Sequence, residues 1–568
     1  MRGVSREPLG KILKDNGFIT DAQLTEALEY AKESGKRLGQ ALIDKGYISD
    51  IALTRAVASQ LRIPYLDLDR DLADMNPGQE VVDLVPESLA RRHKVIPIEK
   101  VGSRHLKVAM ADPLNVVAMD DLRMATGLEI KPVMASEEHV MEVINQWYRL
   151  DEVVERTLSE FSSERGGDGT TGIDEATMEP EAPIVRLVTT ILAQAVREQA
   201  SDVHLDPSET EVRVRYRVDG VLTEYMRLPR RVLGPVVSRI KVAAGMDIGE
   251  RRLPQDGRYS LTVEGREVDL RVATMPTAHG EKATIRILDK GSVLLSLESL
   301  GFDKPDLKRY AAVTHQPYGM VLVCGPTGSG KTTTLYATLV DINDEAKSIV
   351  TMEDPVEYHL KGINQIPVNR KAGLTFATGL RSIVRLDPDV ILVGEIRDAE
   401  TAEIAIQSAL TGHLVLSTLH TNDAPGALTR LVEMGVEPFL VASSVNGVLA
   451  QRLVRRVCSH CAEPTEVPTD YLKTLMSNGA DPDILKDARF VRAKGCSRCG
   501  SGYRGRLAIA EMLSVSDEIR SAVLARRSSS EIEAIARSQG MTTMLESGIA
   551  KAAQSLTSLE EVIRVVRV

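Results

Sequence analysis

The 568-residue sequence contains no run of about 18 or more apolar residues, the length that a membrane-spanning helix requires. Its first residues also lack the apolar stretch of a signal peptide. We therefore expect the protein to be made and kept in the cytosol.

Cysteine is scarce, with five residues in the whole chain. In a reducing compartment, such residues are expected to be thiols or metal ligands rather than disulfides. Positive charge is also in deficit, since the net charge is -10. This balance, and the lack of basic residues interleaved with aromatic ones, argues against extensive binding of nucleic acid, although a local basic patch could escape such an average. Hydrophobic residues make up 43% of the sequence, so several globular domains are expected.

The strongest motif is a complete phosphate-binding loop of the form G-x-x-x-x-G-K-[ST]. It consists of Gly325, Pro326, Thr327, Gly328, Ser329, Gly330, Lys331 and Thr332, with Thr333 next to it. An apolar run suited to a buried strand precedes the loop, and a helical stretch follows it, which is the context that the motif needs. The loop therefore predicts a nucleoside triphosphate site, with Lys331 on the β- and γ-phosphates and Thr332 on Mg²⁺.

Three later segments have the character of a nucleotide-hydrolysing core. Residues 351–358 place Glu353 and other carboxylates after an apolar strand, where they could polarise a water or hold Mg²⁺. Residues 389–395 form a Walker-B-like strand that ends at Glu395, and residues 411–421 form a strand between His413 and His420. Each feature alone is weak, but their succession after a phosphate loop indicates ATP hydrolysis.

Four cysteines form two C-x-x-C knuckles, Cys458 with Cys461 and Cys496 with Cys499. Paired knuckles of this kind suit a tetrahedral Zn²⁺ site, and a closed four-cysteine site is structural because it leaves no position for substrate. A pair of redox-active dithiols is the alternative interpretation.

The chain before the loop divides into several segments. Residues 1–60 contain two copies of one helical unit, since 8–21 recurs as 37–50. A small α+β region follows to about residue 150, and 151–183 is predicted to be a flexible linker. Two hairpins then predict a separate α+β domain over 184–295, before an ATPase domain at 296–568 that carries the cysteine segment at about 455–505.

Taken together, the motifs over about residues 180–568 resemble those of the secretion ATPase superfamily, and particularly of its type IV pilus assembly and type II secretion ATPases. The resemblance implies a RecA-like P-loop ATPase core, a preceding PAS-like α+β domain and an N-terminal helical-repeat region, that is, a multidomain α/β and α+β fold. It also implies a homohexameric ring that binds ATP between the PAS-like and RecA-like parts.

The same resemblance implies roles for individual residues. Glu353 resembles the residue that activates water, Glu395 belongs to the Walker B element, and the two histidines resemble a pair that senses the nucleotide. Arginines of the site are matched by Arg271, Arg286, Arg381 and Arg397.

The helical repeat resembles the cyclic-di-GMP-binding module of some secretion and pilus ATPases. The second copy keeps the pattern at Arg37, Leu38, Gly39 and Gln60. The first copy has Pro8 and Ala31 where the Arg and Gln would stand, so a helical docking domain is an equal alternative.

The function that follows is an ATPase motor that polymerises pilin for type IV pilus extension, or pseudopilin for type II secretion. The expected partners are an inner-membrane platform protein and other assembly proteins. The cytosolic motor would contact the membrane only through these partners. Two other classes of protein stay open. One is a RecA-like nucleic acid motor, although the negative net charge argues against it, and the other is a nucleotide-binding regulator.

Overall fold

The computed structural model describes residues 9–15, 17–34, 36, 38–48, 50–61, 63–66, 77, 79–82, 84–147, 183–263, 265–289, 296–468, 475–476, 485, 488–496 and 499–566. Nearly all of the predicted linker, 151–183, lies outside these residues, which resume at Pro183. The chain forms two compact units, Met1–Gly172 and Ile173–Val568. Within the described ranges, no helix is both long and apolar enough to cross a bilayer.

The first unit begins with two helical hairpins, which the sequence repeat predicted. They are built from α1 (Leu9–Asp15), α2 (Asp21–Ser34), α3 (Leu38–Asp44) and α4 (Asp50–Leu61). The copies pack alike: an ideal Cβ on Gly10 would lie 2.9 Å from Leu24, and one on Gly39 would lie 2.9 Å from Leu53. Glycine thus lets the two helices of each copy approach closely at these positions.

A three-stranded α+β domain completes the first unit. Its elements are α6 (Gln79–Val82), α7 (Glu87–His93), β1 (Val95–Val101), β2 (His105–Met110), α8 (Val116–Thr126), β3 (Glu129–Met134) and α9 (Glu137–Trp147). The sheet order is β1-β2-β3, with β1 antiparallel and β3 parallel to β2. The small α+β domain expected from the alternation of short apolar segments is thus present.

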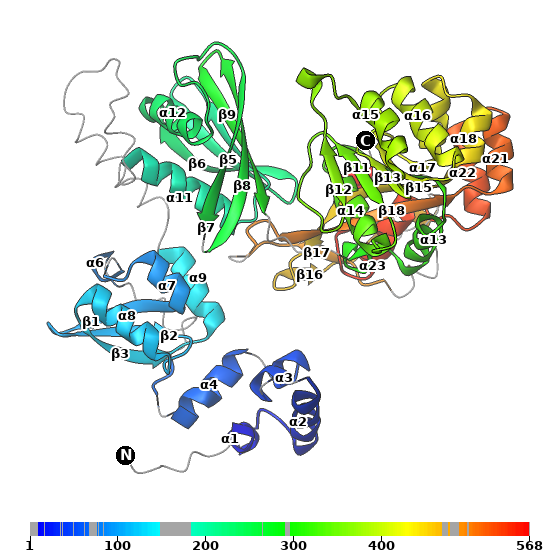
Figure 1. The fold of residues 1–568 in the computed structure, drawn as a ribbon. Helices are drawn as coiled ribbons and strands as arrows, with labels where there is room; N and C mark the ends of the chain where they lie inside the picture. Colours follow the sequence, from blue (N-terminus) through cyan, green and yellow to red (C-terminus); the bar gives the residue numbers. More distant parts are fainter. Residues whose placement is uncertain are drawn as a thin grey trace. The chain divides into compact units, whose positions relative to one another are not determined.

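The second unit starts with a PAS-like domain, in which a six-stranded antiparallel sheet packs against two helices (Figure 1). Its elements are α11 (Pro183–Arg197), β4 (Asp202–Pro207), β5 (Glu211–Val218), β6 (Val221–Pro229), α12 (Leu233–Ala243), β7 (Gln255–Val263), β8 (Arg266–Thr277) and β9 (Gly280–Asp289). The sheet order is β6-β5-β4-β9-β8-β7. The predicted turn at Asp219-Gly220 is confirmed, since both residues have positive φ, 49° and 82°.

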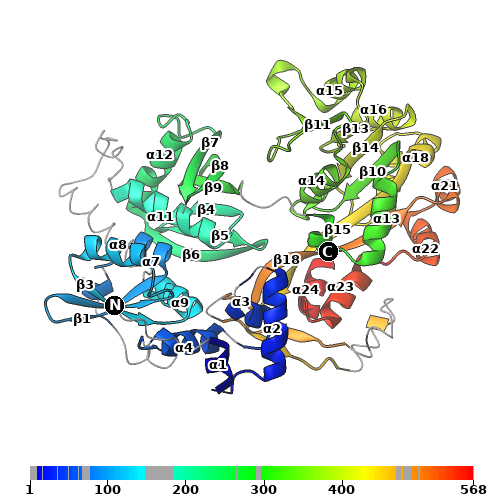
Figure 2. The same ribbon diagram turned by 60° about the horizontal axis from the view of Figure 1, so that its bottom comes forward.

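The RecA-like core is a seven-stranded sheet of order β12-β11-β13-β14-β10-β15-β18, parallel except for β18. Its strands are β10 (Gly319–Cys324), β11 (Ile349–Glu353), β12 (Asn364–Pro367), β13 (Val390–Val393), β14 (Leu414–Leu419), β15 (Val445–Val457) and β18 (Tyr503–Ser514). Strands β10, β11, β13 and β14 are buried along their whole length, as their apolar sequences predict. Figure 2 shows them next to one another.

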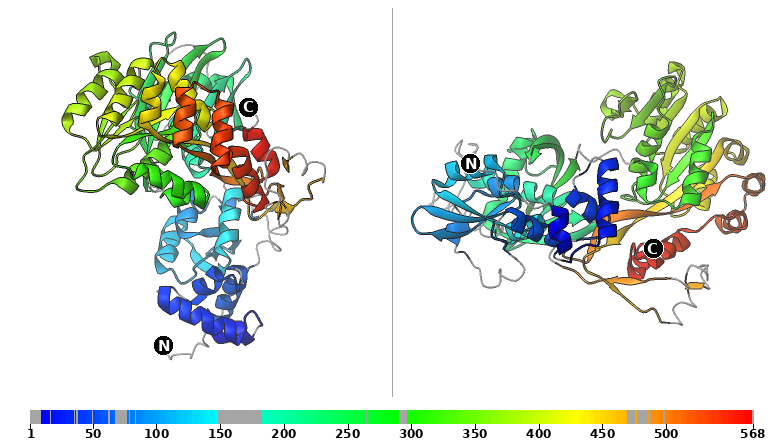
Figure 3. Two further views of the ribbon diagram at one scale, coloured as in Figure 1. Left: turned by 90° about the vertical axis from the view of Figure 1, so that its right-hand side faces the viewer. Right: turned by 90° about the horizontal axis from the view of Figure 1, so that it is seen from below.

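Helices cover both faces of this sheet. They are α13 (Lys304–Thr314), α14 (Lys331–Ile342), α15 (Phe376–Ile383), α16 (Ala399–Leu410), α17 (Ala424–Glu433), α18 (Pro438–Ser444), α21 (Asp517–Leu524), α22 (Ser529–Ser538), α23 (Met544–Ala553) and α24 (Leu559–Val566). The last four, orange to red in Figure 3, pack on the core through α18, α17, β18 and β15. A short ribbon of β16 (Ala462–Pro464) and β17 (Val491–Ala493) carries the cysteine segment. Since the carboxyl ends of the parallel strands share one edge, the loops after β10, β11, β13 and β14 gather there.

Candidate functional site

The phosphate loop connects β10 to α14, in the strand, loop and helix order that the sequence predicted. Its glycines adopt backbone conformations that other residues avoid, with φ of 143° at Gly325, 81° at Gly328 and 86° at Gly330. Between them, Pro326 and Thr327 are exposed, as is Thr332 in the first turn of α14. The exposed backbone and the helix N-terminus form a surface suited to phosphate.

Lys331 folds back over this loop. Its Nζ donates hydrogen bonds to the carbonyl oxygens of Gly325 at 2.7 Å and Pro326 at 3.0 Å. Burial lowers the pKa of Lys331, and the nearby charge of Glu395 acts in the opposite direction. The ammonium group is thus held at the loop by neutral carbonyls, which an anionic phosphate would outcompete.

Glu395 lies two residues beyond the end of β13, the strand that pairs with β14. Its carboxylate pairs with Arg397 at 2.6 Å and lies 3.4 Å from Nε2 of His420. The structure thus brings together three of the predicted site residues, Glu395, Arg397 and His420. They lie at the same edge of the sheet as the loop of Lys331, which follows β10.

Glu353 closes β11 in a buried position, with 3% of its surface exposed. One carboxylate oxygen accepts a hydrogen bond from Tyr336, and the other accepts from Thr351 at 2.5 Å and from Gln365 at 3.2 Å. These three donors hold the carboxylate in one orientation. Tyr336 and Gln365 were not predicted from the sequence, because nothing in the sequence places a helical tyrosine beside a strand end.

The two histidines lie at opposite ends of β14. His420 follows the strand and reaches Glu395, whereas His413 precedes it, with Nδ1 2.9 Å from the Ser408 carbonyl oxygen. Since the six residues of β14 separate them, they are about 20 Å apart along the sheet. His413 therefore lies at the edge away from the phosphate loop.

The remaining predicted arginines have protein partners of their own. Arg381 pairs with Glu400 at 2.6 Å on the surface of the RecA-like core. Arg271, on β8, donates to the Val356 carbonyl oxygen at 2.9 Å and pairs with Glu357 at 3.0 Å, both in the segment after Glu353. Arg286, on β9, pairs with Asp202 at 3.1 Å and is largely exposed. Arg271 thus touches the acidic segment, and Arg286 stays within its own sheet.

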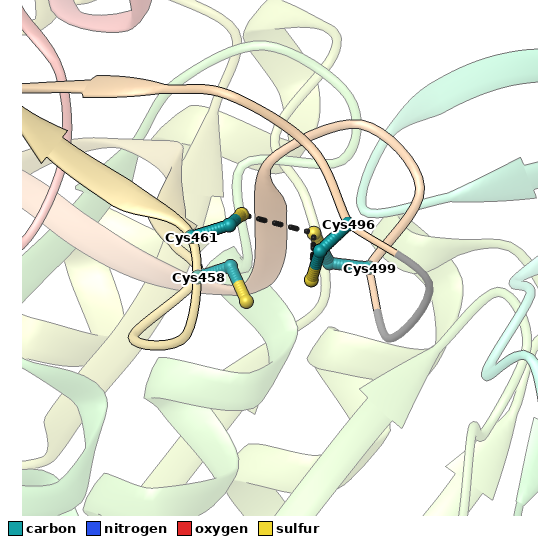
Figure 4. Close-up of side chains that lie close together, drawn as sticks. All are labelled: Cys458, Cys461, Cys496 and Cys499. Atoms are coloured by element: carbon teal, nitrogen blue, oxygen red, sulfur yellow. Dashed lines mark hydrogen bonds between the residues drawn. The ribbon is translucent and has the colours of Figure 1, made fainter. Parts of the chain in front are cut away.

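The four knuckle cysteines converge on one point (Figure 4). Their sulfur atoms all lie within 4.8 Å of one another, and Cys499 Sγ is 3.5 Å from Cys461 Sγ and 3.6 Å from Cys496 Sγ. Four thiolates about 2.3 Å from a central Zn²⁺ would be about 3.8 Å apart, so the cluster fits zinc. The separations exceed the roughly 2.05 Å of a disulfide bond. Cys324 is buried elsewhere, beside the phosphate loop.

The residues of the predicted cyclic-di-GMP motif are only partly described. Leu38 and Gly39 begin α3, with Gly39 packed on Leu53, and Gln60 lies near the end of α4. Arg37 and Pro8 lie outside the described residues.

Sequence comparisons match two families. Residues 177–564 match the type II/IV secretion system protein family, and residues 61–154 match the MshEN domain. The second match covers the small α+β domain and not the helical repeat.

Individual relatives agree with the first match. The chain is 43% identical over 563 residues to the type IV pilus assembly ATPase PilB of Myxococcus xanthus, covering 98% of each protein. It is 52% identical over 390 residues to the type II secretion system protein E of Pseudomonas aeruginosa, covering 68% of this chain and 76% of that protein. The solved ATPase DotB of Yersinia pseudotuberculosis shares the fold, with a TM-score of 0.50 and 20% identity over 70% of this chain and 96% of that chain.

Proposed function

Because the chain belongs to the type II/IV secretion system protein family, whose members include ATPases, we propose that it works as a hexameric ATP-driven motor for type IV pilus extension. That it is a secretion ATPase hydrolysing ATP follows from the family. One observation carries the assignment of its site: the complete phosphate loop that follows β10 lies at the same edge of the parallel sheet as Glu395, which contacts Arg397 and His420. This cluster combines phosphate binding with a carboxylate at one sheet edge.

Each residue has a proposed part in the reaction. The backbone of Gly325 to Gly330 and the Lys331 ammonium group would hold the phosphates, and the Thr332 hydroxyl would hold Mg²⁺, whose chemistry is to neutralise negative charge on a phosphoryl group. Glu353 orients and activates the attacking water, and Glu395 is the carboxylate of the Walker B element. His420 senses the bound nucleotide through its contact with Glu395. His413, at the far edge, would contribute only through β14.

Arginines of the PAS-like domain would make ATP hydrolysis depend on closure of that domain onto the RecA-like core. Arg271 and Arg286 belong to the PAS-like domain, and we assign them to the γ-phosphate of ATP bound between the two domains of the motor. Arg381 and Arg397 supply positive charge from the RecA-like side. An arginine delivered by a second domain makes hydrolysis depend on domain movement, which is how a ring could convert turnover into work.

Type II secretion is the second candidate. A type II secretion system protein E of Xanthomonas campestris matches 96% of this chain at 43% identity, much as the pilus assembly ATPase of Myxococcus xanthus matches 98% of it at 43% identity. In either case, the partners would be an inner-membrane platform protein and filament assembly proteins, and the motor would sit at the cytoplasmic side through them.

Complementation would test this assignment. The full chain should hydrolyse ATP in vitro and restore surface pili to a host that lacks its own pilus assembly ATPase, but not secretion to a host that lacks its type II secretion ATPase. The Lys331→Ala protein, present at the same level, is the matched control and should do neither. Restored secretion without pili would establish the second candidate, and a chain with no ATPase activity would refute both.

The helical repeat is proposed to bind cyclic-di-GMP through its second copy, at Arg37, Leu38, Gly39 and Gln60. We expect calorimetry with the full chain to detect binding of cyclic-di-GMP but not of GMP, because the motif presents a cation and an amide to guanine. Gln60→Ala should weaken binding roughly tenfold, the cost of one hydrogen bond to a charged or polar group. Ala31→Ser, at the matching position of the first copy, is the control. If calorimetry detected no heat at high cyclic-di-GMP concentration, the helical repeat would instead be assigned as a docking domain.

The cysteine knuckles are proposed to hold one structural Zn²⁺. All four sulfur atoms lie within 4.8 Å of one another, as the ligands of one tetrahedral Zn²⁺ would, whereas a pair of redox-active dithiols has no need to bring the two knuckles together.

A further inference from the structure

Gln451 lies beside the phosphate loop, on the strand that flanks β10 opposite β14. In the parallel pairing of β10 with β15, Cys324 is opposite Ala450, so Gln451 is level with Gly325, the first residue of the loop. Its side chain is buried, with 1% of the residue exposed. Neither the phosphate loop motif nor the roles given to the other site residues involve this position.

Both ends of the Gln451 amide are used. The amide Nε2 donates to the carbonyl oxygen of Ser329 at 2.7 Å, and Oε1 accepts from the hydroxyl of Thr334 at 2.8 Å. Ser329 belongs to the last turn of the loop, and Thr334 to the first turn of α14. One side chain therefore fastens the loop and the helix start to β15.

The backbone of Gln451 also shapes the loop. An ideal Cβ on Gly325 would lie 2.4 Å from the Gln451 carbonyl oxygen, and one on Gly330 would lie 3.2 Å from its Nε2. Such distances mean that the loop is wrapped closely around this residue. The requirement for glycine at Gly325 thus comes partly from Gln451.

We propose that Gln451 is a positioning residue for ATP binding, which holds the phosphate loop in its curled form before nucleotide arrives. The loop binds phosphate through N–H groups that point inward only while the chain is curled, so holding that shape lowers the cost of binding. This inference rests on the proposed ATPase function. Gln451 acts on the affinity for nucleotide through the phosphate loop, and it touches no reacting atom.

The test measures nucleotide affinity and kinetics of Gln451→Glu, which keeps the size of the side chain but replaces the donating amide. We expect Kd for ADP and KM for ATP to rise at least tenfold, corresponding to about 1.4 kcal/mol, while kcat changes less than about threefold. A purely structural defect would instead lower the folded fraction, which reduces apparent kcat and leaves KM unchanged. Gln407→Glu, which adds the same charge on the exposed side of α16, should behave as wild type.

Thr334→Val provides a second route if Gln451→Glu fails to fold. It removes one of the two amide contacts while preserving side-chain size, and should raise Kd for ADP in the same direction by a smaller factor. Unchanged Kd in the folded Gln451→Glu protein, or in Thr334→Val where the first does not fold, would overturn the inference. A wild-type chain that binds no ADP or ATP would overturn the proposed function instead, so the two failures are distinguishable.

Discussion

The Glu353→Gln protein should bind ATP with nearly wild-type affinity and lose at least about 100-fold in turnover. General-base catalysis contributes about 10²- to 10⁴-fold, and an amide cannot accept the proton of the attacking water. Affinity should survive because the partners of Glu353 are Tyr336, Thr351 and Gln365, none of which belongs to the phosphate loop. Steady-state ATPase assays and binding of a fluorescent ATP analogue measure the two quantities.

The Glu395→Gln protein is the informative comparison. Glu395 acts electrostatically on Lys331 and pairs with Arg397, so its loss should change nucleotide affinity and turnover together. Glu433→Gln, a surface carboxylate at the end of α17, is the matched control and should change neither. If Glu353→Gln kept wild-type turnover with intact ATP binding, the water-activating role would pass from Glu353 to another carboxylate.

The phosphate loop and its flanking elements were predictable because that chemistry is local. A phosphate site needs glycines, a lysine and a helix start that are consecutive in the chain, so a single stretch carries the whole signal. The hairpin at Asp219-Gly220 was predictable for the same reason, since a two-residue turn dictates its own backbone.

Contacts between distant segments could not be predicted in this way. Gln451 is 120 residues or more beyond most of the loop that it holds, and a glutamine in an apolar strand has no signature of its own. The positions of His413 and His420 show a related limit. The sequence places both beside one strand, but only the direction of β14 in the parallel sheet decides which of them reaches Glu395.

Removal of zinc is the second change for which we expect a large effect, in this case on the stability of the cysteine segment. We expect about one zinc per chain in protein purified without chelator, and loss of that zinc in Cys461→Ser, because a tetrahedral site needs all four thiolates. Structural zinc contributes about 10–16 kcal/mol of apparent binding free energy in small zinc domains at neutral pH. Of the six residues in β16 and β17, only Val491 is buried, so the ribbon should lose protection from hydrogen exchange when zinc leaves.

Metal analysis and hydrogen-exchange mass spectrometry over about residues 455–505 provide the measurements. Cys324→Ser is the control, because Cys324 is buried beside the phosphate loop and should leave the zinc content unchanged. A chain with no zinc at any stoichiometry, and with knuckle thiols that form disulfides on mild oxidation, would favour the redox interpretation.

Strand β15 has one further consequence, which is mechanical. It runs without interruption from Val445 to Val457, is hydrogen-bonded to β10 for its first half, and ends directly before Cys458. Arg452, the next residue after Gln451, contacts Asn422 beyond His420 at 3.2 Å, and Arg455 pairs with Glu561 of α24 at 2.8 Å. A load applied at the cysteine knuckles would therefore pull along the strand axis and shear its hydrogen bonds to β10 in parallel. Because Gln451 lies on the same strand, β15 connects the cysteine segment directly to the phosphate loop.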